Sequence, residues 1–450
     1  MGIVHIRAAS LALLAAAALP ATAAAKTVHF RARHAGEAKL AVTANAPRAD
    51  WGVTGHESAV LSVRLDGRYA TSIVVFNGRR TLTYRVALGH VRAGRHTVTV
   101  RLDRAKSPDT RVRILRLRPY RAPRGNLVAR YAPVLYGRDL PEIPGAYENS
   151  HTDVPLLAYH TSTVPDAAGN RTIEYTMIWS NEDEGTDTPA LMARWGRTTD
   201  IEWIYRVTID AAGRRIADSY QAANHATLPF DGLREGDHPL LETATGNNNT
   251  AAVTDLHKTT GYRFFLDTSW GLPPGRAREA AMDAHPWTYR VMAQEMIRER
   301  KVEPVASPDT PAMSDQRDYL YLEVKKATRY NAPPVPGSWA GVALAVQLKG
   351  DPRWYLSNHG IPDESIQRDD PAATTVELPP GTNPGTVAAI EALAVPVGVP
   401  SDYAITVSAL RRGFFLSRTF VPRPSFVRWR GSVTLTPAQP AAVLWRAPPG

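Results

Sequence analysis

Two carboxylates stand two residues apart where a polar segment becomes a strand-like run. In an extended strand, Asp200 and Glu202 would share one face with Arg206, with the two acidic Cα atoms roughly 7 Å apart and Trp203 on the opposite face. Of two carboxylates at that separation, one can act as a general acid and the other as a base or nucleophile, or both can bind the same metal ion. Structural ion pairs with Arg197 and Arg206 explain the same spacing equally well.

The aromatic residues around Glu202 favour it as the general acid. Trp195 precedes it and Trp203 follows it, and an apolar neighbourhood keeps a carboxyl group protonated. The partner that stays ionised, as base or nucleophile, would then be Asp200 or Asp153. We therefore expect one carboxyl group of the cluster to have a raised pKa.

Other acidic and imidazole side chains gather in the same part of the chain. Glu182 lies in an acidic loop after a strand pattern, His151 and Asp153 form an H-x-D motif, and His225 belongs to a group of closely spaced histidines. Neutral imidazole accepts a proton or binds a divalent metal, although each histidine alone also fits a structural role. The sequence predicts one pocket, with no organic cofactor and a divalent cation left open, lined by Glu202, Asp200, Asp153, Glu182, His151 and His225.

Several other chemistries find no support in the sequence. The chain has no G-x-S-x-G nucleophile elbow, no P-loop, no dinucleotide fingerprint and no H-E-x-x-H zinc motif. It contains no cysteine, which excludes thiol catalysis and disulfide scaffolds. The chain must therefore fold on packed apolar cores.

The first 25 residues have the three regions of an export signal. A charged start is followed by an apolar run over 8–18, then Pro20 and a series of small residues over 21–25. The apolar run is about half of the roughly 20 residues needed to span a bilayer, which favours cleavage over anchoring. No later segment is long and apolar enough to cross a membrane. Together with a composition rich in alanine, proline and arginine, this predicts a secreted or periplasmic bacterial protein.

Residues 26–118 have the pattern of a β-sandwich. Short alternating runs are separated by turn signals, including the hairpin dipeptides Asp66–Gly67 and Asn77–Gly78. In this pattern the segment resembles a jelly-roll-like carbohydrate-binding module. Three aromatic residues either stack on sugars or pack into the core, namely Trp51, Tyr69 and Tyr84.

The rest of the chain is also expected to be mainly β. A proline- and arginine-rich linker at 119–125 leads to a β-rich, catalytic-size domain at 126–450. Helical periodicity is confined to one excursion near 276–301. A proline-rich boundary leaves open whether 338–450 is a separate β subdomain. The predicted fold class is therefore mainly β, with a sandwich followed by a larger β-rich domain.

The net charge of +10 comes largely from arginine, with the densest run at 111–124. Such a run forms either an electrostatic patch for acidic glycans, lipid headgroups or nucleic acid, or a solvated strand face. No nucleic-acid fold signature accompanies it, so a nucleic-acid partner is not predicted.

Two segments carry a resemblance to a known family. Arg130–Tyr136 and Trp195–Glu202 resemble a β-rich family of largely unassigned function, whose plant members are associated with vacuolar sorting. The chain departs from that family at Gly137–Arg138–Asp139, where acidic and aromatic residues are expected. The resemblance implies a mainly-β second domain and assigns no catalytic residue.

These observations favour a secreted hydrolase that acts on a polysaccharide or glycoconjugate by carboxylate acid/base chemistry. A non-catalytic glycan- or surface-binding protein is the first alternative. A metal-dependent hydrolase of phosphate esters or lipids is the second.

Overall fold

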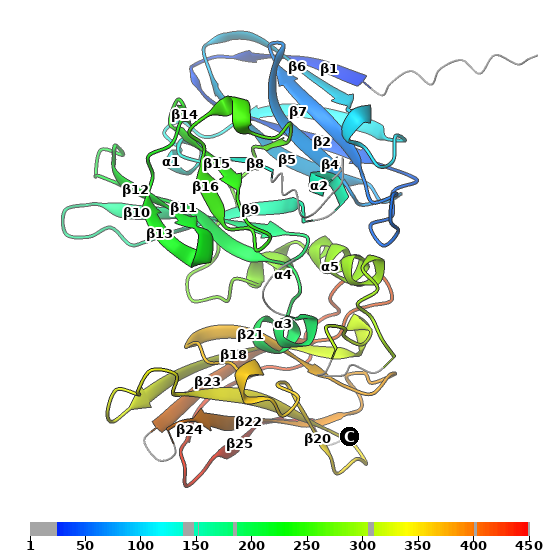
Figure 1. Ribbon diagram of the computed structural model, residues 1–450, viewed down its shortest axis with the longest axis vertical. Helices are drawn as coiled ribbons and strands as arrows, with labels where there is room; N and C mark the ends of the chain where they lie inside the picture. Colours follow the sequence, from blue (N-terminus) through cyan, green and yellow to red (C-terminus); the bar gives the residue numbers. More distant parts are fainter. Residues whose placement is uncertain are drawn as a thin grey trace, which may run out of the picture.

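The computed structural model describes residues 25–137, 148–151, 153–182, 187–304, 310–399 and 403–448. In this part the chain is mainly β, as predicted, and it forms three layers that follow one another down Figure 1. An N-terminal sandwich is followed by a middle region of two sheets and then by a C-terminal sandwich. Of the predicted export signal, residues 1–24 lie outside the described residues.

The N-terminal layer is the predicted β-sandwich. One sheet has the order β1 (Ala25–Ala32), β6 (Gly94–Leu102), β3 (Ala59–Leu65) and β4 (Arg68–Val75). The other has the order β5 (Leu82–Val91), β2 (Gly36–Asn45) and β7 (Arg113–Arg121). Strand β7 thus continues into the segment 119–125 that the sequence indicates as a linker.

The two dipeptides predicted to form hairpins behave differently. Asp66 and Gly67 have φ of 50° and 82° and join the antiparallel pair β3–β4, so this hairpin is confirmed. The hairpin at Asn77–Gly78 is wrong, because β4 and β5 belong to different sheets. The carbonyl of Gly78 accepts a hydrogen bond from Ala46 N at 3.0 Å, which fixes the turn as a corner between the sheets.

The middle region contains two sheets. The first is antiparallel, with the order β13 (Ala226–Pro229), β12 (Arg215–Ala222), β11 (Ile201–Ile209), β10 (Arg171–Trp179) and β9 (Pro155–Ser162). The second has the order β14 (Arg234–Glu235), β15 (His238–Thr243), β8 (Val134–Tyr136) and β17 (Arg263–Phe264), with β16 (Thr250–Ala252) paired to β15. Short helices accompany them: α1 (Leu127–Arg130), α2 (Glu148–His151) and the 3-10 turns η2 (Ala223–His225) and η3 (Leu256–Lys258). A further 3-10 turn, η1 (Arg104–Lys106), lies between β6 and β7 of the N-terminal sandwich.

The helical excursion near 276–301 is confirmed as α4 (Ala280–Ala284) and α5 (Trp287–Arg298). The expectation that helical structure is confined there is wrong, since α3 (Thr188–Trp195) precedes β11. Its signals are caps rather than apolar periodicity. Asp187 accepts from Ala190 N at the start, and Gly196 ends the helix with φ of 66°.

The C-terminal layer is a second sandwich with its own core. One sheet has the order β21 (Asp370–Glu377), β18 (Tyr319–Tyr330), β23 (Tyr403–Phe414) and β24 (Trp429–Leu435). The other has the order β20 (Trp354–Leu356), β19 (Trp339–Leu348), β22 (Val387–Val397) and β25 (Ala441–Arg446). Two 3-10 turns belong to this part, η4 (Gln316–Asp318) and η5 (Pro362–Glu364). The layer begins at β18, ahead of the boundary that proline-rich 331–337 indicates.

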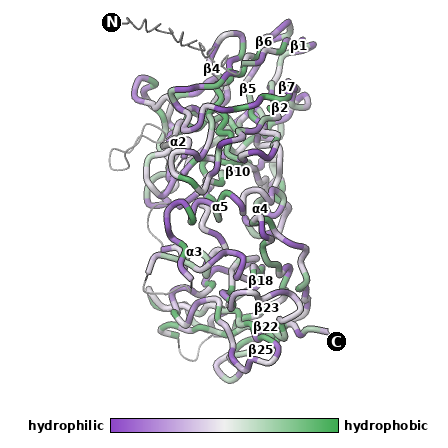
Figure 2. The backbone as a smooth tube through the Cα atoms, turned by 90° about the vertical axis from the view of Figure 1, so that its right-hand side faces the viewer, coloured by the Kyte–Doolittle hydropathy of each residue, from purple (hydrophilic) through white to green (hydrophobic). Residues whose placement is uncertain are grey.

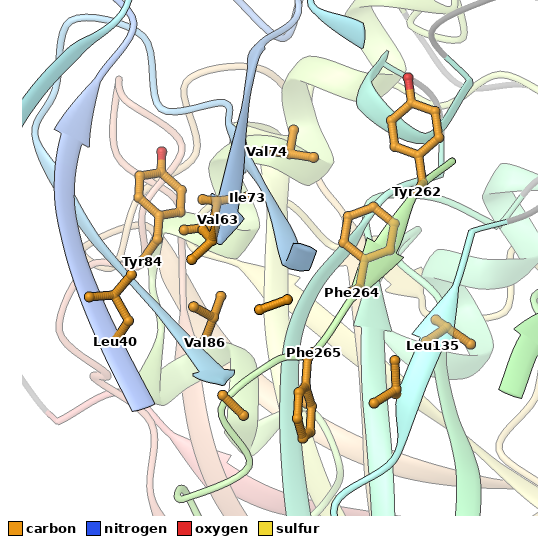
Figure 3. Packing of buried hydrophobic residues seen from close by; sticks show 14 of the residues in the cluster. Leu40, Val63, Ile73, Val74, Tyr84, Val86, Leu135, Tyr262, Phe264 and Phe265 are labelled. Atoms are coloured by element: carbon orange, nitrogen blue, oxygen red, sulfur yellow. The ribbon is translucent and has the colours of Figure 1, made fainter. Parts of the chain in front are cut away.

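The layers are joined by packed apolar side chains. One continuous core runs through the N-terminal sandwich and the middle region, and Figure 3 shows Leu135, Phe264 and Phe265 of the middle region beside Val63 and Val86 of the sandwich. A methionine- and tyrosine-rich cluster joins the middle region to the C-terminal sandwich. The helices α3, α4 and α5 lie at this second junction, between β10 and β18 in Figure 2.

The α3–β21 contact generates a stability prediction. A Cβ added at Gly196 would lie 3.1 Å from Thr374 N and 3.2 Å from Thr374 O, backbone atoms that cannot swing away. Gly275 has the same φ of 66°, but a Cβ added there would have no atom within 4 Å. The substitution Gly275→Ala therefore measures the cost of the left-handed backbone alone. Gly196→Ala is expected to lower the unfolding free energy by about 1–3 kcal/mol more than Gly275→Ala. Urea unfolding measures the difference, and equal losses would contradict tight docking of α3 on β21.

Candidate functional site

The predicted site residues gather at one end of the five-stranded sheet. Because β9 to β12 are antiparallel neighbours, the starts of β9 and β11 meet the ends of β10 and β12. Asp153 lies just before β9, Glu182 after β10, Asp200 directly before β11, and His225 in η2 after β12. Chain topology alone therefore brings together residues that are far apart in sequence.

Three carboxyl groups at this end interact electrostatically. Asp200 is buried, and burial together with Glu202 and Glu182 raises its pKa well above the ordinary value. Burial also raises the pKa of Glu182, to about 7, with Glu202 adding to the shift and Arg197 opposing it. The raised pKa values thus fall on Asp200 and Glu182, and the assignment of Glu202 as the general acid stays a prediction.

Amide side chains hold the acidic groups in place. Gln221 Nε2 donates to Glu202 Oε2 at 2.8 Å and lies 2.8 Å from His225 Nδ1, which is itself 3.9 Å from the same Glu202 oxygen. Asn248 Nδ2 donates to Asp200 Oδ2 at 3.1 Å. We call Glu182, Asp200, Glu202, Gln221, His225 and Asn248 the acid site.

The backbone around the acid site is held in an uncommon conformation. Asn224, His225 and Asn248 have φ of 58°, 56° and 51°, and Asp153 has φ of 35°. Left-handed backbone at a non-glycine residue costs free energy and persists where surrounding contacts over-determine it, which is common at ligand sites. Thr250 Oγ1, donating to Gln221 O at 2.7 Å, ties the asparagine loop to β12 and fixes this arrangement.

A β-bulge changes which side chains share a face of β11. Tyr205 pairs with Tyr175 and Trp203 with the next residue, Thr176, so Ile204 is the extra residue. One inserted residue reverses the alternation beyond it. The predicted separation of Trp203 from Arg206 is therefore wrong, and the Arg206 guanidinium lies 3.7 Å from the centre of the Trp203 ring.

The two flanking arginines are engaged elsewhere. Arg197 Nε forms a buried ion pair with Glu279 Oε1 at 3.1 Å, and Arg206 Nε pairs with Glu174 Oε2 at 2.7 Å. The alternative, that these arginines form ion pairs with Asp200 and Glu202, is therefore wrong. Arg197 still opposes the rise in the pKa of Asp200.

Behind the acid site, arginines surround a half-buried tryptophan. Four guanidinium groups lie 4.0 to 5.9 Å from the centre of the Trp195 ring, those of Arg368, Arg278, Arg197 and Arg194. Burial and the neighbouring guanidiniums lower the pKa of Arg368 to about 10. The guanidinium groups of Arg197, Arg194 and Arg278 stand close enough to Glu182 to oppose the effect of its burial on its pKa.

His151 and Asp153 lie at the same end of the sheet but on the β9 side. His151 ends α2, where the preceding carbonyl, that of Ser150, accepts a hydrogen bond from Ser58 Oγ. Asp153 is buried, and the next residue, Val154, is bonded through its N–H to Ser180 Oγ at 2.9 Å. β10 separates them from Glu202, so their assignment to the same pocket stays a prediction.

Sequence reasoning missed Gln221, Asn248, Arg278 and Glu279. The sequence contains a signal for Asn248, because asparagine is, after glycine, among the residues that best tolerate the left-handed backbone conformation that Asn248 adopts. Gln221 had none, since only the pairing of β11 with β12 places it beside Glu202. Within the described ranges, no group of three or more histidine, aspartate or glutamate side chains is arranged to hold a metal ion. No helix in the part of the chain that the structure covers could cross a membrane.

In sequence, no protein-family model and no curated protein matches this chain. The resemblance to the vacuolar-sorting-associated family therefore remains a prediction, and Arg138 and Asp139, where the chain departs from it, lie outside the described residues.

Structural neighbours are carbohydrate-binding modules. A family 35 carbohydrate-binding module from an environmental isolate matches 22% of this chain and 73% of its own, at 15% identity and a TM-score of 0.15. The C-terminal domain of EclA, a sugar-binding protein, matches 24% of this chain and 87% of its own, at 18% identity and a TM-score of 0.15. The tandem CBM51 modules of a family 98 glycoside hydrolase from Streptococcus pneumoniae match 84% and 78%, at 9% identity and a TM-score of 0.15.

The raised pKa of Glu182 predicts a pH-dependent stability. Between its ordinary pKa of 4.5 and about 7, the unfolded chain loses this proton while the folded chain keeps it, so stability falls as pH rises. Glu182→Gln removes the cost and is expected to gain little at pH 4.5 and up to about 3 kcal/mol at pH 7, relative to the unaltered protein. Chemical denaturation at both pH values measures this. Asp363→Asn, at an exposed carboxyl of the C-terminal sandwich, is the control. The same gain in unfolding free energy at both pH values would contradict the prediction that Glu182 is protonated in the folded protein.

Proposed function

We propose that this protein is an exported glycan-binding protein and that the acid site takes the sugar. The observation that supports this most is the set of planar polar side chains Glu202, Gln221 and His225, in which Gln221 contacts both of the others and His225 stands on left-handed backbone. Carboxylate, amide and imidazole groups in fixed geometry suit the closely spaced hydroxyl groups of a sugar. A preformed site also loses less free energy to ordering when the ligand binds.

Accessibility within the acid site is graded, which supports entry of a ligand from one side. The His225 side chain is 53% exposed, that of Glu202 is 14% exposed, and Asp200 is fully buried. A ligand would thus meet His225 and Glu202 first. Gln221 and Asn248 would support these groups from behind.

The binding proposal predicts the effect of one exposed histidine. His225→Ala is expected to weaken binding of the recognised glycan about tenfold or more, because it removes hydrogen bonds from the exposed rim of the site. His90→Ala is the matched control, since His90 is 56% exposed and also lies beside a glutamate, Glu37, at 3.0 Å. Titration calorimetry, after a panel of neutral and acidic glycans has been screened, measures both. A panel without any binder, or equal losses in the two variants, would contradict the proposal.

Hydrolysis of the bound glycan is a second candidate, favoured by the raised pKa of Glu182 beside a second carboxylate. A carboxyl group with a pKa of about 7 is still largely protonated in mildly acidic solution and can donate to a leaving oxygen. Glu202 would be the partner carboxylate, held by Gln221. The roles differ from those expected from sequence, where Glu202 is the acid.

The hydrolase candidate predicts a pH profile. Release of reducing sugar should fall as pH rises through about 7, because Glu182 loses the proton it must donate. Glu182→Gln should lower the rate by roughly 10²- to 10⁴-fold while glycan binding persists. Glu202→Gln should lower it similarly. Binding without any release of reducing sugar would reject hydrolysis and leave the binding proposal standing.

A further inference from the structure

A cavity of about 570 Å³ lies between the N-terminal sandwich and the middle region, and none of its lining residues belongs to the acid site. Residues of β4 and β5 form one side, and the start of β9 with the segment after β17 forms the other. That segment runs along the free edge of β5, where Leu266 bridges to Val86 and Phe265 O accepts from Ala87 N at 2.8 Å. Figure 3 shows Tyr84, Val86 and Phe265 in this seam. The cavity thus belongs to neither layer alone.

One wall of the cavity is a continuous series of rings. Phe76 and Trp287 have their centres 5.1 Å apart, Trp287 and His285 6.2 Å, and His285 and Trp270 5.7 Å. Trp270, His285 and Trp287 are only partly buried, so ring surface faces the open space. Aromatic walls of this kind suit the apolar C–H face of a sugar ring as well as other flat apolar groups.

The cavity also carries an uncompensated positive charge. Lys39 and Asp267 neutralise each other at 2.6 Å, and burial lowers the pKa of His285, whose Nδ1 is hydrogen-bonded to Ala281 O. Arg85 lines the cavity, is exposed, and forms no ion pair with any residue that the structure describes. A ligand that places a carboxylate near Arg85 would supply the missing charge.

Arginines of β7 extend the positive charge of Arg85 across the neighbouring sheet face. Ala41 of β2 pairs with Arg85 on β5 and with Arg118 on β7, so the two arginines lie on one sheet face about 10 Å apart. Arg116 lies two residues from Arg118 on that face. Arg116 and Arg118 are exposed and form no ion pair within the described ranges. The basic face, defined as Arg85, Arg116 and Arg118, therefore leads away from the cavity.

We propose that the cavity and the basic face together bind an acidic polysaccharide, with one uronate ring against the aromatic wall and its carboxylate beside Arg85. The next carboxylates of the chain would follow the basic face. The lining includes Ser72, Thr83 and Tyr120, whose hydroxyl groups also hydrogen-bond to Tyr69, Thr43 and Asp267, and this partly polar lining favours a sugar over a fatty acid. This site is separate from the acid site and does not depend on it.

Titration calorimetry with trigalacturonic acid at low salt tests the proposal on the full chain. The unaltered protein should bind it, with affinity that falls as salt increases. Arg85→Gln should weaken binding at least about tenfold, whereas Arg101→Gln, at an exposed arginine on the other sheet of the sandwich, should leave it unchanged. Trp287→Leu should weaken it as well, and because Arg85 is exposed, the Arg85 result stands even if the Trp287 variant fails to fold.

Three outcomes would overturn the proposal. They are no binding of trigalacturonic acid at low salt, equal affinity for linear polyphosphate or oleate, and loss of binding on Glu202→Gln rather than on Arg85→Gln. The last outcome would assign the acidic glycan to the acid site instead. Conversely, failure of every glycan at the acid site, with trigalacturonic acid still dependent on Arg85, would reject the proposed function and leave this inference intact.

Discussion

The buried ion pair between Arg197 and Glu279 is the constraint on which the centre of the molecule depends. Burial alone would raise the pKa of Glu279, yet Arg197, Arg368 and Arg278 together hold it below the ordinary value. These arginines come from the α3–β11 connection, the C-terminal sandwich and the segment before α4. A buried charge without such partners is strongly destabilising, so the three segments are held at one point.

The same point sets the electrostatics of the acid site. Two of the guanidinium groups that neutralise Glu279, those of Arg197 and Arg278, also reach Glu182, and they limit how far burial raises the pKa of its carboxyl group. Asp200, deeper in the protein, is hydrogen-bonded to Asn248, and burial together with Glu202 raises its pKa well above the ordinary value. One sheet end therefore holds carboxyl groups in different protonation environments, as acid/base chemistry requires. A structural role for these buried groups would need the same neutralisation, so binding and turnover, rather than stability, distinguish a functional acid site from a structural one.

Much of the fold follows from local signals, and the exceptions have physical causes. Alternation and an Asp-Gly turn predict β3 and β4, because both depend on residues adjacent in sequence. Asn77–Gly78 carries an equally strong turn signal, but whether the next strand returns to the same sheet is decided by tertiary packing. Helix α3 has too short an apolar stripe for periodicity to reveal, whereas its caps at Asp187 and Gly196 were readable.

For the acid site, the sequence supplied the carboxylates and not their environment. Asp200, Glu202, Glu182 and His225 were identifiable because acidic and imidazole side chains gather in one part of the sequence. Which side chains of β11 share a face depends on the bulge at Ile204, a single inserted residue that strand periodicity does not reveal. The arginine run shows the opposite case. Its charge was evident in the sequence. Its position beside Arg85, however, depends on the sheet register, because Ala41 pairs with Arg85 on one side and with Arg118 on the other. That register places the arginine run next to the aromatic cavity.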